Sequence, residues 1–202
     1  MKRVWVSATL LSMILGVVFA GVVSAARFNK KVDIGQKAPS FEDLAGVDGK
    51  QHSLADYDDK KIVVLIFTGN ECPVAQAYEQ RFNEFQEKYR DKGVALIAIN
   101  CNLEDYDNID AMKKHAAERD FKFAYLHDDT QASGKVFGAT VTPHLFVLDS
   151  DRNIAYMGAF DDNMLLDQVK HNYLPDAVDA LLAGKQPEVT ETRQKGCGIQ
   201  YR

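Results

Sequence analysis

Cysteine is scarce in this sequence, and the common cysteine patterns are missing. The 202 residues contain three cysteines, Cys72, Cys101 and Cys197, too few for a disulfide-stabilised scaffold. None belongs to a Cys-x-x-Cys pair, and none of the five histidines has the spacing of a zinc site. These absences argue against a small disulfide-rich domain and against a conventional zinc module, so no metal ligand is assigned.

Basic residues are also in the minority. Lys and Arg number 24 against 29 Asp and Glu, and the bases form no stripe, which argues against nucleic acid as a partner. The sequence has no internal repeat and no low-complexity segment. With 46% hydrophobic and 26% charged residues, the composition is that of a globular protein of one domain.

The N-terminus has the parts of a secretory signal peptide. Lys2 and Arg3 precede an uncharged run over residues 4–23, which ends in the small residues Ser24-Ala25-Ala26. We therefore expect residues 1–26 to be a signal peptide and the protein to be periplasmic or secreted. An uncleaved anchor formed by residues 4–23 is the alternative, and only then would the protein contact a membrane.

Alternating strand and helix patterns predict an α/β domain over residues 27–184. Residues 61–67 (KIVVLIF) and 94–99 (VALIAI) are typical of buried strands, and a helix beginning at Pro73 connects them in a right-handed βαβ unit. The remaining expected elements are a hairpin turning at Asp48-Gly49, helices over 109–119 and 131–137, a strand over 123–126, an antiparallel hairpin of 145–148 with 154–157, and a last helix from Asp162 or Asn163 to Leu182, kinked or split at Pro175.

This order predicts an α/β sandwich. A mixed central sheet is flanked by helices, an N-terminal β-hairpin extends it, and a polar C-terminal tail over residues 185–202 carries Cys197.

Cys72 is the strongest candidate for a reactive group. It stands between a buried strand and the helix that begins at Pro73, where the helix dipole and unpaired N–H groups stabilise a thiolate. The carboxyl end of the sheet is also where open α/β folds place their sites. The alternative is a small buried hydrophobic residue, and the neighbouring Glu71 would raise the pKa of a thiol.

Thr142-Pro143 is the second feature. This bond directly precedes a predicted strand, and a cis prolyl bond there would expose the backbone of Thr142 to a bound chain. Local sequence alone also allows a trans turn, but the order of elements favours cis. Pro73, Thr142 and Pro143 are therefore predicted to line a groove for substrate or partner.

Two motifs give the sequence a specific resemblance. The segments IGQKAPSF, DGKQHSL, KKIVVLIFTGNECPVA and VTPHLFVLD resemble the redoxin branch of the thioredoxin-like superfamily, which holds the alkyl hydroperoxide reductase and thiol-specific antioxidant proteins. Asn70–Pro73 and Gly196–Tyr201 are similar to the N-x-C-P and terminal G-C-x-I-x-aromatic motifs of a peroxiredoxin-like group. The resemblance runs from about Val32 to the C-terminus. It implies a thioredoxin-like fold, Cys72 as the redox-active thiol and Pro143 as the cis proline.

The sequence also departs from its relatives. Ala75 stands where a thioredoxin has the second cysteine of Cys-x-x-Cys, and Leu65 and Gly69 replace the Pro and Thr of a standard peroxiredoxin. A second thiol must therefore come from elsewhere. Cys101 follows the second strand and could meet Cys72 at one edge of the sheet, whereas Cys197 lies between glycines that favour access and ranks slightly ahead.

The sequence thus predicts a thiol-dependent oxidoreductase without an organic cofactor. Cys72 would attack a hydroperoxide or a disulfide, Cys197 or Cys101 would resolve the product, and a thioredoxin-like protein or a small thiol would restore the reduced state. One alternative is a copper-binding or copper-delivery protein on this fold, although Gln76 stands where a Cys-x₃-Cys pair would end. Another is a non-catalytic binding domain.

Two further expectations concern polar residues near these motifs. His144 is expected to be a solvated residue at the start of a strand, although an approach to Cys72 is the alternative. The acidic segments 56–59 and 104–107 lack a calcium-loop pattern and are expected to be solvated loops.

Overall fold

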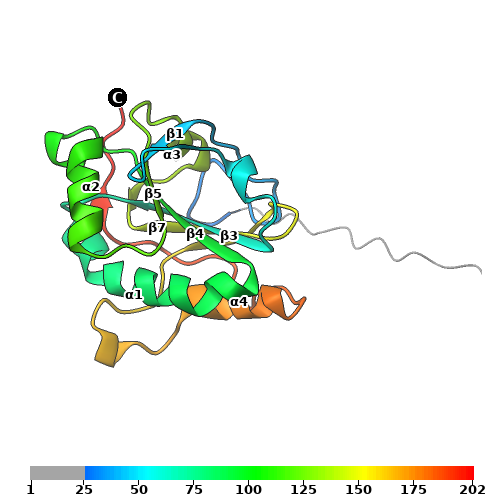
Figure 1. The fold of residues 1–202 in the computed structure, drawn as a ribbon. Helices are drawn as coiled ribbons and strands as arrows, with labels where there is room; N and C mark the ends of the chain where they lie inside the picture. The colour runs from blue at the N-terminus through cyan, green and yellow to red at the C-terminus, as the bar shows by residue number, and fades with distance from the viewer. Residues whose placement is uncertain (1–25) are drawn as a thin grey trace, which may run out of the picture.

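A computed structural model describes residues 26–202, and its centre is a seven-stranded mixed sheet (Figure 1). The predicted signal peptide lies outside these residues except for Ala26. The spatial order of the strands is β2-β1-β5-β4-β3-β7-β8. Their bounds are Leu44–Gly46 (β1), Gln51–His52 (β2), Ile62–Thr68 (β3), Val94–Asn100 (β4), Ala124–His127 (β5), His144–Leu148 (β7) and Ile154–Gly158 (β8).

The two predicted buried strands form the middle of the sheet. β3 and β4 are parallel, in register from Ile62 opposite Val94 to Thr68 opposite Asn100, and all their residues are buried. β7 pairs antiparallel with the other edge of β3, and β8 with β7. The predicted mixed sheet and both hairpins are confirmed.

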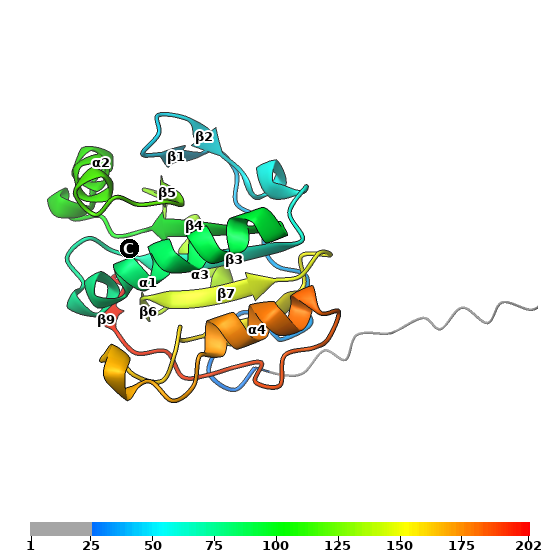
Figure 2. The ribbon, with the colours of Figure 1, turned by 60° about the horizontal axis from the view of Figure 1, so that its bottom comes forward.

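Helices cover both faces of the sheet. They are α1 (Pro73–Tyr89), α2 (Ile109–Glu118), α3 (Ala132–Phe137) and α4 (Tyr173–Leu182). Figure 2 shows α1 and α4 side by side along one face, where the aromatic side of α1 packs on β3 and β7. α3 packs on the opposite face through Phe137.

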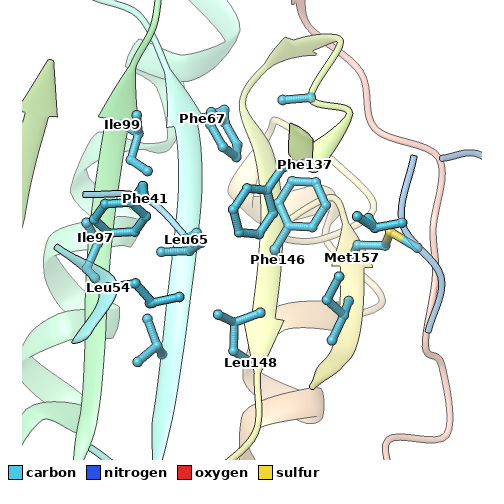
Figure 3. Close-up of a cluster of buried hydrophobic side chains, with 14 of the residues drawn as sticks. Phe41, Leu54, Leu65, Phe67, Ile97, Ile99, Phe137, Phe146, Leu148 and Met157 are labelled. Carbon is cyan, nitrogen blue, oxygen red and sulfur yellow. The ribbon is translucent and has the colours of Figure 1, made fainter. Parts of the chain in front are cut away.

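The core on the α3 face draws on distant parts of the chain. Figure 3 shows Phe67, Phe137 and Phe146 meeting between the strands, and their ring centroids are 5.2–5.8 Å apart. The N-terminal segment adds Val32, and the C-terminal tail adds Ile199. The tail is therefore part of the folded domain.

The last predicted helix is wrong at its start. α4 begins at Tyr173, so Pro175 lies in its first turn, where its missing N–H group is not needed. Asp162 does not begin a helix, because its carboxylate accepts hydrogen bonds from the backbone of Lys170 and His171 and closes a loop instead. No helix within residues 26–202 has the length and apolar character needed to cross a membrane.

The tail ends in a strand of its own. β9 (Cys197–Gly198) pairs antiparallel with β6 (Val141–Thr142), which directly precedes Pro143. This two-stranded sheet lies at the N-terminal end of β7 and near the start of α1 (Figure 2). It brings the C-terminal motif to the N-x-C-P motif.

Candidate redox site

Cys72 is the N-cap residue of α1. Pro73 occupies the first helical turn, and the Cys72 sulfur accepts a hydrogen bond from the backbone N–H of Ala75 at 3.4 Å. Only 5% of the Cys72 surface is exposed. The side chain therefore replaces a capping hydroxyl and faces the positive end of the helix dipole, as the sequence pattern predicted.

Thr142 lies directly opposite this thiol. The Thr142-Pro143 peptide bond is cis, and the Thr142 carbonyl accepts a hydrogen bond from the Cys72 thiol at 2.9 Å. The Cys72 sulfur thus contacts both the first turn of α1, through the Ala75 N–H, and the residue before the cis proline, through the Thr142 carbonyl.

Cys197 reaches the same place from the tail. In the β6–β9 pairing it stands opposite Thr142, the residue whose carbonyl the Cys72 thiol contacts, and both cysteines line the same small cavity. Both sulfurs are free thiols, with Cys72 buried and Cys197 exposed. The structure therefore brings together two of the three predicted cysteines, together with all three residues predicted to line the groove.

The surroundings favour a thiolate at Cys72. Burial raises the pKa of this thiol, but the side chains of Cys197 and Thr142 and the backbone N–H of Ala75 favour the thiolate and outweigh burial, so the pKa lies below its ordinary value of 9.0. A lowered pKa increases the fraction of nucleophilic thiolate at neutral pH.

Cys197 has the opposite character. Partial burial, the interaction with the Cys72 side chain and the negative charge on the Cys72 thiolate raise the pKa of Cys197 to about 11. Cys72 is therefore the thiol of this pair that ionises first.

Each element of the terminal motif has a structural reason. A Cβ atom on Gly196 would overlap the carbonyl oxygen of Thr142, so only glycine lets the tail cross there. Ile199 is buried in the core on the α3 face, and its N–H donates to the Thr140 carbonyl at 3.0 Å. The Tyr201 hydroxyl donates to the Ala139 carbonyl at 2.8 Å. Before Cys197, the Gln194 side chain donates to the Thr140 hydroxyl at 3.2 Å, so the tail is anchored on both sides of Cys197.

Cys101 lies elsewhere. Its side chain is fully buried in the core cluster on the α3 face, where Gly134 and Tyr201 surround it. Burial raises the pKa of Cys101 to about 12, although the nearby Tyr201 hydroxyl lowers it. Cys101 therefore packs among core residues, and the cysteine that shares a cavity with Cys72 is Cys197.

Asp107 is a site residue that sequence reasoning missed. It was expected in a solvated loop, yet it is 2% exposed and accepts hydrogen bonds from the Asn70 N–H at 2.8 Å and the Asn100 side chain at 2.6 Å. Burial raises the pKa of Asp107, and these hydrogen bonds oppose the shift. Asp107 holds the loop that presents Cys72. The signal was the pair of asparagines at the ends of buried strands, whose amides need a partner.

His144 also differs from its expectation as a solvated residue. It is 1% exposed, opposite Phe67 on the neighbouring strand, and its ring lies 4.6 Å from that of Phe146. Burial lowers the pKa of His144 to about 3, so the imidazole is neutral. A neutral ring supplies no positive charge to stabilise a thiolate.

A small cavity of about 140 Å³ opens beside the two thiols. Its lining residues include Cys72, Cys197 and the acidic side chains of Glu71, Glu104 and Asp107. Within residues 26–202 no three His, Cys, Asp or Glu side chains are grouped in a way that could hold a metal ion.

The fold and the site define a class. A mixed sheet between helices, a cysteine capping the first long helix and a cis proline opposite it make a thioredoxin-like protein with the site of a thiol oxidoreductase. The Redoxin family model matches residues 33–170, and the chain belongs to the Redoxin family.

Two relatives support this class. The chain is similar to thiol-disulfide oxidoreductase ResA of Bacillus thuringiensis subsp. konkukian, with 30% identity over 62% of this chain and 69% of the relative. It also resembles peroxiredoxin Q of Populus jackii, with 29% identity over 54% of this chain and 48% of that protein. The protein is thus a thiol-dependent oxidoreductase of the redoxin type.

Solved structures show the same fold. A hypothetical protein from Sinorhizobium meliloti 1021 has a TM-score of 0.80 and 28% identity, and the match covers 86% of this chain and 97% of that one. A putative thiol:disulfide interchange protein DsbE from Chlorobium tepidum has a TM-score of 0.55 and 27% identity over 62% and 84% of the two chains. The predicted thioredoxin-like fold is confirmed.

Proposed function

We propose that the protein is a thiol–disulfide oxidoreductase that uses Cys72 as nucleophile and Cys197 as resolving thiol. The observation that carries this proposal is the Cys72 thiol at the N-terminus of α1, with a lowered pKa and Cys197 held beside it by the β6–β9 pairing. The C-terminal tail then supplies the second thiol that the missing Cys-x-x-Cys pair would otherwise provide.

The reaction takes two exchange steps. The Cys72 thiolate attacks one sulfur of a substrate disulfide, forms a mixed disulfide and releases the first substrate thiolate. The Cys197 thiol then loses its proton, attacks the Cys72 sulfur and releases the second substrate thiolate. The substrate disulfide has gained two electrons, and the protein holds a Cys72–Cys197 disulfide. An external dithiol, or two small thiols, reduces that disulfide again.

The pKa values set the order of the steps. The charge and the hydrogen bond of Cys72 help to keep Cys197 protonated, so Cys197 does not compete for substrate. When Cys72 enters a mixed disulfide, its negative charge is lost and two of the causes that raise the pKa of Cys197 disappear. Cys197 becomes nucleophilic once there is a bond for it to break.

Cys101 has no part in this scheme. Its raised pKa and full burial in the core leave it protonated and inaccessible, so we assign it a packing role.

Two features favour disulfides over hydroperoxides as substrates. ResA, the relative with 30% identity, is a thiol-disulfide oxidoreductase by name. Leu65 and Gly69 also replace the Pro and Thr expected in a peroxiredoxin. The N-terminal pattern of residues 1–26 supports export to an oxidising compartment, where such an activity would act on protein disulfides.

The test compares the two substrate classes on the reduced protein. One equivalent of a peptide disulfide or of hydrogen peroxide is added, and the free thiols remaining on the protein itself are counted over time, by alkylation and intact mass, in the wild type, Cys72→Ser and Cys197→Ser. We expect the peptide disulfide to consume two thiols in the wild type within minutes and none in Cys72→Ser, and Cys197→Ser to stop at a mixed disulfide. A faster Cys72-dependent loss with hydrogen peroxide would contradict the proposed substrate class.

A further inference from the structure

The tail occupies the surface that an extended substrate would need. β9 pairs with the backbone of Val141 and Thr142, directly before the cis proline, and Cys197 stands opposite Thr142, whose carbonyl accepts a hydrogen bond from Cys72. With the tail in this position, Cys72 is only 5% exposed. A polypeptide disulfide therefore has no approach to Cys72 along this edge until β9 leaves.

The anchoring of the tail extends well beyond Cys197. Gly196 passes against the Thr142 carbonyl, Ile199 is 8% exposed in the core, and the backbone of Gln200 and Arg202 is bonded to the side chain of Gln131, at 2.8 Å in both cases. An ordinary flexible arm that only delivers a thiol would not need these contacts. They are the contacts of a bound peptide ligand, in the β-addition mode of recognition.

From these contacts we infer that the segment Gly196–Tyr201 and an extended cysteine-containing segment of the substrate protein bind to the same groove in turn. This inference rests on the proposed function. The tail leaves, the substrate strand pairs with Val141 and Thr142, and Cys72 forms the mixed disulfide. The returning tail then competes for the groove, brings Cys197 to Cys72 and displaces the reduced product.

The footprint also specifies the substrate. The residue before the reacting cysteine is glycine, because any Cβ atom there would overlap the Thr142 carbonyl oxygen. The second residue after it is aliphatic, and the fourth is aromatic with a hydroxyl that can reach the Ala139 carbonyl, as Ile199 and Tyr201 show. A glycine is not required directly after the cysteine, since a Cβ on Gly198 meets nothing nearer than Gln200 Nε2 at 3.8 Å.

The experiment follows both steps with one probe. The probe is the octapeptide of residues 195–202, with its cysteine joined to thionitrobenzoate, so that attack by Cys72 releases the coloured thiolate. Acid quenching and mass spectrometry follow the mixed disulfide. The proteins are the wild type, Ile199→Ala, Tyr201→Phe, Val189→Ala and Cys72→Ser, all as full chains. Val189 is an exposed tail residue outside the footprint and serves as the matched control.

If the docked tail blocks the groove, weakening its contacts should speed attack of Cys72 on the probe and slow the later attack of Cys197 on the mixed disulfide. We expect Ile199→Ala to release thionitrobenzoate on the order of tenfold faster than the wild type, because the groove is open in a larger fraction of molecules, and to accumulate the mixed disulfide. Tyr201→Phe, which loses one hydrogen bond, should change both steps in the same directions by a smaller factor. Val189→Ala should match the wild type.

The outcomes separate the two proposals. A slower second step with an unchanged first step in both anchor variants would show that the tail only supplies a thiol, and would overturn the inference while leaving the proposed function intact. Equal release by the wild type and Cys72→Ser would instead contradict the proposed function. A second probe with alanine before its cysteine should react several-fold more slowly than one with alanine after it, and equal rates would overturn the assigned footprint.

Discussion

At the scale of single residues, the site depends on an inequality between two thiols. Cys72 caps a helix and receives hydrogen bonds that favour its thiolate, whereas Cys197 keeps its proton partly because of Cys72. The same contact therefore lowers one pKa and raises the other. The result is a fixed order of reaction within one pair of cysteines.

This inequality predicts the pH dependence of the first step. Only the thiolate attacks, and the pKa of Cys72 lies below its ordinary value of 9.0, so the rate should rise with pH and have its midpoint below pH 9.0. The measurement is the pseudo-first-order rate of Cys72 alkylation by iodoacetamide between pH 5 and 10, with Cys197→Ala as comparison, because alanine has no side-chain donor. Loss of the Cys197 hydrogen bond should move the midpoint upward. A midpoint that does not move would contradict the coupling.

Cys101 gives a second prediction at this scale. Because its thiol is buried in the core and its pKa is raised to about 12, Cys101→Ala should leave the rates of both exchange steps within about twofold of the wild type. The free energy of unfolding should fall by about 1 kcal/mol, the usual cost of a small core truncation. If the mixed disulfide at Cys72 persisted in this variant, as measured by counting the free thiols on the protein, the resolving role would belong to Cys101.

At the scale of elements, the pairing of β9 with β6 connects the end of the chain to the start of α1. The pairing is short, and it is held by residues on either side of it. Gly196 is the position where it is most sensitive, because the backbone of Thr142 leaves no room for a side chain.

A pair of glycine variants tests this element. Gly196→Ala should slow formation of the Cys72–Cys197 disulfide by roughly tenfold or more, since about 1.4 kcal/mol against the docked tail suffices for that factor. Gly198→Ala should have a much smaller effect, because its Cβ has space. The rate is measured by quenched-flow alkylation after oxidation. Similar rates in the two variants would show that the docked tail is not the reacting conformation.

Local sequence patterns account for some elements of the fold and not for others. The apolar runs of β3 and β4 and the proline at the start of α1 are local signals, and they predicted the sheet centre and the position of Cys72 correctly. The last helix was placed too early, because Asp162 bonds to the distant Lys170 and His171, a contact that no local pattern reveals.

The same limit applies to the site. Cys197 was a candidate from its glycines, but its place opposite Thr142 depends on Ile199 reaching the core, a contact between distant parts of the chain. Asp107 and His144 were both expected in solvent but are buried. The sequence could not predict this, because the burial of a polar side chain depends on which distant elements pack over it.

At the scale of the whole molecule, the tail makes the domain continuous from the first described residues to the C-terminus. The core on the α3 face contains Val32 from the N-terminal segment and Ile199 from the tail. A disulfide between Cys72 and Cys197 would therefore close a loop that spans most of the sheet, and it should change the free energy of unfolding of the whole domain.

We expect the oxidised protein to be more stable than the reduced one. A disulfide closing so long a loop stabilises by about 2–4 kcal/mol, mainly by restricting the unfolded chain. Urea unfolding of the two forms should show this difference in the wild type and none in Cys197→Ser. A reduced form that is equally or more stable would mean that the disulfide strains the docked tail.

The measurement that tests the central claim most directly is disulfide mapping by mass spectrometry after one equivalent of substrate has oxidised the reduced protein. We predict one intramolecular disulfide between Cys72 and Cys197, with Cys101 recovered as a free thiol. A bond between Cys72 and Cys101, or between Cys197 residues of two molecules, would contradict the assignment of the tail as the source of the resolving thiol.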